Sequence, residues 1–306
     1  MDKNQLFKNL SVPEGKIDVV LDTDTYNEVD DQFALSYMLK SDDKLNVKAL
    51  FAAPFFNSNS TSPADGMIKS YNEILTFLKL CKRVDLREFT FKGSDKYLPD
   101  ENTPVISDAA NHLAKLAKNY SPENPLYVVA IGAITNVASA LLIDPEIAEN
   151  IVIVWLGGHS LDICNADEFN MVQDIAAARV VMGSKAPFVQ LPCYGVVSSF
   201  TLSGAEIVSC LKGKNELCDY LSDYTIGEVE KYAKDWATWT RVIWDVTAVA
   251  WLLNDNNKFM ASRIINKYLP NYDKTYSQPI PDTYMKYVYY INRDKLMNDL
   301  IEKLTK

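Results

Sequence analysis

Short apolar runs alternate with helical segments between residues 17 and 192, and this alternation most constrains how the chain can fold. The first run is β-branched and apolar, which is typical of a buried strand. We expect strands at IDVVLDT (17–23), KLNVKALFAAP (44–54), PLYVVAI (125–131), ENIVIVWLGG (149–158) and APFVQLP (186–192). Helical spacing predicts helices at about 30–39, 64–80, 106–119, 134–142 and 173–184. The order predicts an α/β fold, with a mostly parallel central sheet and helices on both faces.

Three further segments complete the predicted organisation. VDLREFTF (84–91) reads as another short strand, and residues 285–306 read as one strand followed by one helix. Residues 203–254 look mainly helical and aromatic. Because no repeat, low-complexity tract or Pro/Gly linker interrupts the chain, we expect a single domain over residues 1–306. In that domain residues 203–254 would form a helical cap that is partly a lid.

Charge and hydropathy exclude two classes of partner. The net charge is −9 over 306 residues, and a nucleic-acid backbone needs a basic surface. The longest hydrophobic stretch, residues 125–143, contains Thr135, Asn136 and Ser139 and reads as strand, turn and helix rather than a membrane span.

The N-terminal residues and the cysteines predict a cytoplasmic protein. The opening MDKNQLFKNL has no apolar signal-peptide core. The cysteine count is odd and no pair has CxxC spacing, so we expect reduced, mostly buried thiols. These are Cys81, Cys164, Cys193, Cys210 and Cys218.

Five carboxylates crowd the junction between the first strand and the helix after it. They are Asp22, Asp24, Glu28, Asp30 and Asp31, in the segment VVLDTDTYNEVDDQF. One or two could cap the helix and favour its dipole. The mutual repulsion of the rest would cost several kcal/mol in a partly buried site, by order-of-magnitude Coulomb arguments. A divalent cation removes that cost, and all-oxygen ligation indicates Ca²⁺ or Mg²⁺ rather than zinc.

The same segment allows a second interpretation. VVLDTDT resembles the first motif of haloacid-dehalogenase-type phosphatases, in which Asp22 would be the nucleophile and Asp24 the general acid. That interpretation leaves Asp30 and Asp31 without a role, and the later lysine and acidic pair of that family are not evident.

Four segments together resemble the inosine–uridine nucleoside hydrolase family. VVLDTDTYNEVDDQFAL resembles its DxDxGxDDxxAL signature, and VVAIGAITNVASAL resembles its strand followed by LTN. GGHSLDICNADEFNMVQDIAAA and IWDVTAVAWLL resemble its EFN and HDPLAVA segments. The resemblance covers about residues 17–255. It implies an enzyme that hydrolyses the N-glycosidic bond of ribonucleosides, giving free base and ribose, with purine nucleosides among the substrates. It also makes a homo-oligomer possible.

The resemblance implies specific roles. Ca²⁺ would be held by Asp24, Asp31, the carbonyl of Thr135 and Asp245. Asp24 would also take the proton of a metal-held water, and Asp22 would support the site from behind. The ribose would be held by Asp30, Asn57, Asn165, Glu168 and Asn170.

The chain departs from the family pattern in three places. The loop from Asp24 to Asp30 is two residues longer than the family's, so Tyr26, Asn27 and Glu28 would reach toward the pocket. The Asn at 165 is displaced in the sequence. Trp244 replaces the family's leaving-group acid, a histidine.

Other groups are candidates for the role of the absent leaving-group acid. His159, after Gly-Gly, could face the pocket as a catalytic group, whereas His112 lies within a helix and reads as structural. A purine stacked between aromatic rings becomes a better leaving group if its N7 is protonated, and the candidates for such a stack are Trp244, Trp239 and Tyr232. The loss of the acid also leaves open a protein that binds a ribosyl ligand without hydrolysing it.

Overall fold

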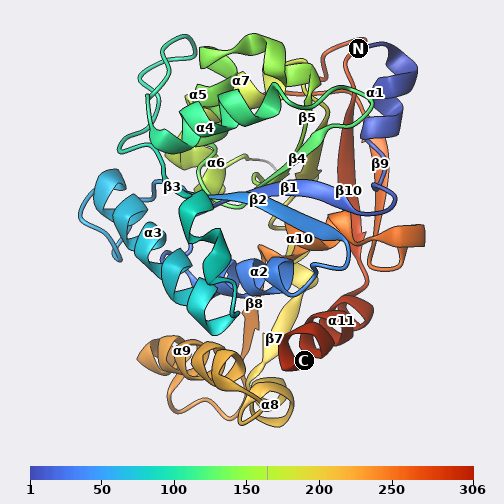
Figure 1. Cartoon of the computed structure of the whole chain (residues 1–306). Helices are drawn as coiled ribbons and strands as arrows, with labels where there is room; N and C mark the ends of the chain where they lie inside the picture. Colours follow the sequence, from blue (N-terminus) through green and yellow to red (C-terminus); the bar gives the residue numbers. More distant parts are fainter. Residues whose placement is uncertain (164) are drawn as a thin grey trace.

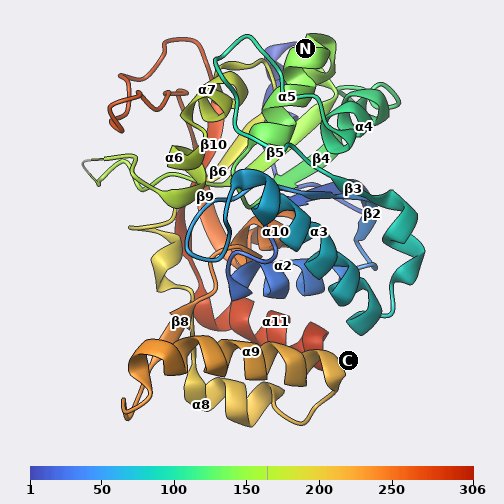
Figure 2. The same cartoon turned by 90° about the vertical axis from the view of Figure 1, so that its left-hand side faces the viewer.

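A computed structural model describes residues 1–163 and 165–306 of the chain. Its centre is an eight-stranded sheet, which Figures 1 and 2 show from two directions. The strands are β1 (Ile17–Thr23), β2 (Leu45–Ala52), β3 (Thr90–Lys92), β4 (Leu126–Ala130), β5 (Ile151–Leu156), β6 (Phe188–Leu191), β9 (Met260–Ile265) and β10 (Met285–Ile291). Their order is β3-β2-β1-β4-β5-β6-β10-β9, and every pairing is parallel except that of β9 with β10. The predicted mostly parallel sheet is confirmed.

Helices cover both faces of this sheet and create two apolar cores (Figure 1). One face packs against α2 (Val29–Leu39), α3 (Pro63–Leu80), α10 (Val246–Leu252) and α11 (Arg293–Thr305). The other packs against α4 (Asp108–Ala117), α5 (Thr135–Ile143) and α7 (Ile175–Gly183). Neighbouring residues of one strand enter different cores, as Val19 and Val20 of β1 do. This explains why the central strands β4 and β5 are apolar throughout.

The prediction for residues 84–91 is wrong over its first part. Val84–Phe89 form a 3₁₀ helix, and the strand β3 begins only at Thr90. Val84 and Phe89 are 62% and 47% exposed, so the segment has no second layer to bury an extended run. The edge strand β9 and the short helices α1 (Lys3–Asn9) and α6 (Phe169–Gln173) were not predicted.

The segment 203–254 is mainly helical, as predicted, but it also contains strand. Its helices are α8 (Gly204–Glu206), a π-helical turn (Ile207–Leu211), α9 (Glu216–Ala233) and α10. A two-stranded antiparallel sheet joins β7 (Thr201–Ser203) to β8 (Thr240–Val242). Figure 2 shows α8 and α9 stacked beyond α11, away from the central sheet. A lid role for this segment stays a prediction.

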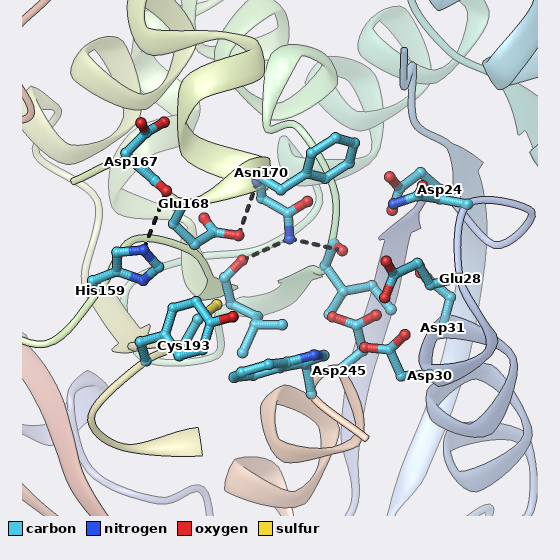
Figure 3. A pocket seen from close by; sticks show the side chains of 16 residues that line it. Asp24, Glu28, Asp30, Asp31, His159, Asp167, Glu168, Asn170, Cys193 and Asp245 are labelled. Carbon is cyan, nitrogen blue, oxygen red and sulfur yellow. Dashed lines mark hydrogen bonds between the residues drawn. The ribbon is translucent and has the colours of Figure 1, made fainter. Parts of the chain in front are cut away.

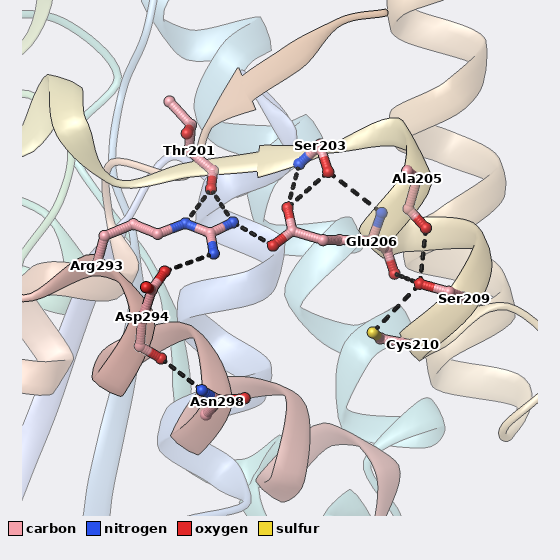
Figure 4. A network of polar contacts seen from close by, with 9 residues as sticks. All are labelled: Thr201, Ser203, Ala205, Glu206, Ser209, Cys210, Arg293, Asp294 and Asn298. Atoms are coloured by element: carbon pink, nitrogen blue, oxygen red, sulfur yellow. Dashed lines mark hydrogen bonds and ion pairs between the residues drawn. The ribbon is translucent and has the colours of Figure 1, made fainter.

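Arg293 anchors the cap to the C-terminal helix (Figure 4). Its guanidinium donates to the carbonyl oxygen of Thr201 from Nε at 3.0 Å and from Nη2 at 2.8 Å, and it pairs with Glu206 at 2.5 Å. Glu206 and Ser203 also form a capping box at the start of α8. Because β7 and α8 are fixed in this way, β8 and the start of α10 are directed toward the central sheet.

The described cysteines are free thiols. Cys81, Cys193 and Cys218 are buried and Cys210 is partly exposed, whereas Cys164 lies outside the described residues. Within residues 1–163 and 165–306, no helix has the length and apolar character needed to cross a membrane.

Asn136 joins the carboxyl ends of several strands. Its Nδ2 donates to Asp22 of β1 at 2.7 Å and to the carbonyl oxygen of Ala52 of β2 at 3.2 Å. Its Oδ1 accepts from the backbone N and the Oγ of Ser94, at 2.7 and 2.9 Å. Since the side chain is fully buried, none of these groups can turn to water when it is removed.

We therefore expect Asn136→Ala to lower the free energy of unfolding by about 3 kcal/mol, because it leaves several buried polar groups unpaired. Urea denaturation measures this change. Asn150→Ala is the matched control, because its partly buried Nδ2 makes one bond, to Ala117, and its loss should cost less than about 1 kcal/mol. Equal losses in the two variants would contradict the role given to Asn136.

Candidate active site

A cavity of about 320 Å³ opens at the carboxyl ends of the parallel strands, where doubly wound sheets bind their ligands. Figure 3 shows carboxylates on one side of it, and His159, Glu168 and Asn170 on the other. Its lining residues are Asp24, Asn27, Glu28, Asp30, Asp31, Ile131, Leu156, His159, Asp167, Glu168, Phe169, Asn170, Cys193, Tyr194, Trp244 and Asp245. Seven of them are carboxylates, so the cavity is suited to a cation or to a group that gains positive charge.

Capping of helix α2 does not account for these carboxylates. Glu28 occupies the N-cap position but makes no side-chain capping bond, and Asp30 and Asp31 lie in the first turn. Asp245 stands at the start of α10 and also makes no capping bond. The structure therefore does not support the capping explanation of this cluster.

Three carboxylates converge closely enough to hold a metal ion. Oxygen atoms of Asp30, Asp31 and Asp245 all lie within 4.8 Å of one another, and all three side chains are buried. Thr23 orients Asp31 by donating from Oγ1 to Oδ1 at 2.5 Å. Both oxygens of Asp24 and Oδ1 of Asp30 are buried without a hydrogen-bond partner among the described residues. Unpaired buried carboxylate oxygens fit a hard cation such as Ca²⁺ or Mg²⁺.

Burial and mutual repulsion disfavour ionisation of this cluster in the metal-free protein. Desolvation raises the pKa of Asp31 to about 7. The pKa of Asp24 and that of Asp245 are raised well above the usual range, first by burial and then by the charge of Asp31. A divalent cation reverses this effect by favouring the charged forms.

The converging set differs in part from the expected ligands. Asp30, expected to hold ribose, groups with Asp31 and Asp245. Asp24 lines the same cavity. Thr135 is fully buried at the start of α5 and is not a lining residue, and its Oγ1 donates to Asp174 at 2.6 Å.

Besides Asp30, two of the five expected ribose-binding residues line the cavity, on the side opposite the carboxylate cluster (Figure 3). The oxygens of Glu168 accept from the backbone N–H groups of Gly158, Asn170 and Met171. Asn170 donates from Nδ2 to the carbonyl oxygens of Ile131 and Leu156, which leaves Oδ1 for a ligand.

The other two expected residues lie away from the cavity. Asn57 donates from Nδ2 to Oδ1 of Asn27 at 2.5 Å and so supports a lining residue. Asn165 is exposed, and its Oδ1 accepts from the backbone N of Asp167 at 3.1 Å.

Of the aromatic candidates, Trp244 lines the cavity and the other two do not. Trp239 packs close to Gly204, and Tyr232 is 56% exposed next to Trp236. The ring of Trp244 makes an edge contact with Tyr194, with centroids 5.5 Å apart. His159 also lines the cavity, and its ring centroid is 4.9 Å from that of Tyr194. His112 stacks on Phe91 at 4.0 Å, outside the cavity.

The phosphatase interpretation finds no support in the geometry. Asp22, its nucleophile, is fully buried and does not line the cavity. Its Oδ1 accepts from Asn136, and burial raises its pKa to about 7. A carboxylate in this position cannot reach a substrate.

Sequence reasoning missed some lining residues. Of the long loop, Asn27 and Glu28 reach the cavity as expected, whereas Tyr26 does not. Tyr194 and Cys193 follow β6 and carried no motif, although their position after a strand end was a usable signal. Arg241 of β8 was also missed, and its Nη2 pairs with Glu28 at 2.6 Å beside the cavity.

Comparison with known proteins gives one family and one fold. The model of the family described as inosine-uridine preferring nucleoside hydrolase matches residues 19–277. No curated protein sequence gives a match.

Three solved structures illustrate the fold. A plant nucleoside hydrolase has a TM-score of 0.76 at 18% identity, covering 94% of this chain and 99% of that one. The purine-preferring ribonucleoside hydrolase from Gardnerella vaginalis has a TM-score of 0.74 at 18% identity, covering 94% and 98%. The type III effector protein XopQ, complexed with adenosine diphosphate ribose, has a TM-score of 0.71 at 14% identity, covering 100% and 99%.

At these identities the solved structures establish the fold alone, whereas the sequence model spans most of the chain and includes all the converging carboxylates. This protein is therefore an enzyme of the inosine-uridine preferring nucleoside hydrolase family.

Proposed function

We propose that this protein hydrolyses the N-glycosidic bond of ribonucleosides, giving free base and ribose, with Ca²⁺ as cofactor. The observation that carries the proposal is the buried cluster of Asp24, Asp30, Asp31 and Asp245, which lines a cavity large enough for a nucleoside. Both oxygens of Asp24 and Oδ1 of Asp30 have no partner among the described residues. Carboxylates in such a pocket stabilise the positive charge that develops on the sugar as the bond breaks.

The ion would be held by Asp31 and Asp245, with Asp24 or Asp30 beside them and the carbonyl of Thr135 as a further proposed ligand. When bound, Ca²⁺ neutralises the carboxylates and lowers the pKa of a water in its shell. Asp24 is suited to accept a proton from the attacking water, since both its oxygens lack a partner among the described residues and a bound cation favours its ionised form. Glu168 and Asn170 would position the ribose from the other side.

Trp244 is suited to contact the leaving base, and a purine is the base that it would stack best. It lines the cavity directly before Asp245, and its ring is supported by Tyr194. Stacking favours departure of the base without a histidine at this position.

A second candidate is a protein that binds a ribosyl ligand with little turnover. The likeness to XopQ in complex with adenosine diphosphate ribose favours it, as does Trp244 in place of the expected acid. This candidate predicts ligand binding at the same cavity without release of ribose.

The test of the proposed function is release of reducing sugar from a panel of purine and pyrimidine ribonucleosides, with Ca²⁺ and with a chelator. We expect chelator-sensitive release, and Asp24→Asn should reduce kcat by at least about 100-fold because the proton acceptor is lost. Asp18→Asn, at the opposite end of β1, is the matched control and should retain activity. Tight nucleoside binding without ribose release would favour the second candidate.

Metal binding gives an independent prediction for stability. Because the pKa of Asp31 is raised to about 7, the folded metal-free protein holds protons that the unfolded chain releases. Stability of the metal-free protein should therefore fall as the pH rises from about 4 through 7. Ca²⁺ should restore the melting temperature most at pH 8, where its ligands are ionised.

Differential scanning fluorimetry of chelated and Ca²⁺-loaded protein at pH 5.5 and 8 measures both effects. Asp31→Asn should abolish the Ca²⁺-dependent increase in melting temperature, whereas Asp18→Asn should keep it. An equal increase in Asp31→Asn and wild type would place the ion elsewhere.

For Trp244 we expect Trp244→Ala to reduce kcat/KM for inosine by about 10- to 100-fold through loss of the stacked face, while Trp244→Phe retains most activity. Trp239→Ala is the control, because that ring lies outside the cavity. Steady-state kinetics on correctly folded protein measures the effect. Equal losses in the two alanine variants would exclude a direct role for Trp244.

A further inference from the structure

His159 lines the cavity and has a ring nitrogen without a hydrogen-bond partner among the described residues. Its side chain is 5% exposed, and its Nε2 lies 3.2 Å from the carbonyl oxygen of Asp167. Because a carbonyl oxygen can only accept, we assign the ring proton to Nε2. Burial lowers the pKa of His159, so the ring is neutral and Nδ1 carries a lone pair. That Nδ1 is buried and has no partner among the described residues.

The surrounding chain holds the ring in this orientation. The backbone N of His159 donates to the hydroxyl of Tyr276 at 2.8 Å, and that hydroxyl donates back to the carbonyl oxygen of His159 at 3.1 Å. Tyr194 packs against the other side of the imidazole. Nδ1 is therefore a fixed acceptor, and a ligand that donates to it removes the cost of leaving it unpaired.

Several groups near His159 in the cavity are also acceptors. Glu168 and Asp167 are carboxylates, and Asn170 has only Oδ1 left for a ligand. Figure 3 places these groups across the cavity from Asp30, Asp31 and Asp245. Asn165, which was expected to contact ribose, is exposed and does not line the cavity. With these acceptors and the free Nδ1 of His159 together, this end of the cavity is suited to a hydrogen-bond donor of the ligand.

We propose that Nδ1 of His159 accepts a hydrogen bond from the 5′-hydroxyl of the bound N-riboside and thereby selects ligands in which that hydroxyl is free. The proposal rests on the proposed function, and it places the vicinal hydroxyls of the ribose at the carboxylate cluster, where a hard cation binds such oxygens. With the ribose held there, the 5′-hydroxyl is the remaining sugar donor, and the acceptors around His159 are suited to receive it. A 5′-phosphate brings no donor at neutral pH and adds negative charge beside two carboxylates.

This role differs from that of a leaving-group acid. A neutral imidazole whose proton is directed to the carbonyl of Asp167 has no proton at Nδ1 to give to a departing base. His159 is thus a specificity-determining residue of the sugar site rather than a replacement for the histidine that Trp244 displaces.

The test is a cycle of two substrates and two proteins. Inosine and 5′-deoxyinosine are compared on the Ca²⁺-loaded wild type and on His159→Phe, which keeps a ring but removes the acceptor. We expect wild type to lose about 10-fold in kcat/KM when the 5′-hydroxyl is absent. In His159→Phe the loss should shrink to about twofold, since the bond no longer exists in either complex. If His159 had a purely structural role, its replacement would lower kcat/KM for both substrates equally and leave the ratio between them unchanged.

Controls keep the outcomes distinct. His112→Phe, outside the cavity, should keep the wild-type ratio, and His159→Ala provides a smaller replacement if the phenylalanine does not fit. Inosine 5′-monophosphate should not be hydrolysed by wild type. If no riboside is hydrolysed, the proposed function fails, and the same cycle is measured as binding constants for the two ligands.

Two results would overturn the assignment. One is a ratio of kcat/KM for inosine to kcat/KM for 5′-deoxyinosine that, in both His159 variants, equals the wild-type ratio within about twofold. The other is a change confined to 1-methylinosine relative to inosine, which would mean that His159 accepts from an N–H of the base and not from the sugar.

Discussion

The structure depends on burying four like charges at one edge of a parallel sheet. Four carboxylate side chains gather there, and each is at most 3% exposed: Asp24, Asp30, Asp31 and Asp245. Two unit charges 4 Å apart repel by about 4 kcal/mol at an effective dielectric constant of 20. The metal-free cluster avoids part of this repulsion by retaining protons, as the raised pKa values indicate. A bound cation would remove the remaining repulsion and permit full ionisation.

The frame around the cluster is built to hold it. Asn136 and Thr23 bond to Asp22 and Asp31 and so fix the strand end and the helix start relative to each other. Gly132, after β4, lies so close to Asp24 that a Cβ there would stand 2.8 Å from Oδ1. Glycine at this position therefore lets two neighbouring strand ends approach, which places Asp24 at the cavity.

The segment between β6 and β9 completes the site from outside the predicted alternation. The β7–β8 pairing and the anchor at Arg293 direct Arg241, Trp244 and Asp245 toward the sheet. Arg241 then pairs with Glu28 of the long loop, so this loop and the segment 203–254 meet at the rim of the cavity. Trp244, Tyr194 and His159 give the pocket aromatic faces beside its carboxylates.

The sequence by itself determined that the chain forms a mostly parallel sheet, the order of most strands and helices along the chain, and the carboxylates of the candidate site. Strands such as β1 are apolar on both faces, and their pattern is local, so it could be read without knowledge of contacts. The motif segments likewise identified Asp24, Asp31 and Asp245 before any geometry was known. The edge strand β9 and the β7–β8 pair escaped prediction because their burial depends on partners distant in the chain.

Only the tertiary structure decided which polar atoms have partners and which face the cavity. Asn165 was expected at the ribose, but it is bonded to Asp167 and does not line the cavity. Asn57 contacts Asn27, which does line it. Tyr194 lines the cavity although no sequence motif includes it. The free Nδ1 of His159 follows from contacts with Asp167 and Tyr276, the latter more than a hundred residues away. Hydrogen-bond satisfaction is a property of packed neighbours, and sequence spacing alone does not specify it.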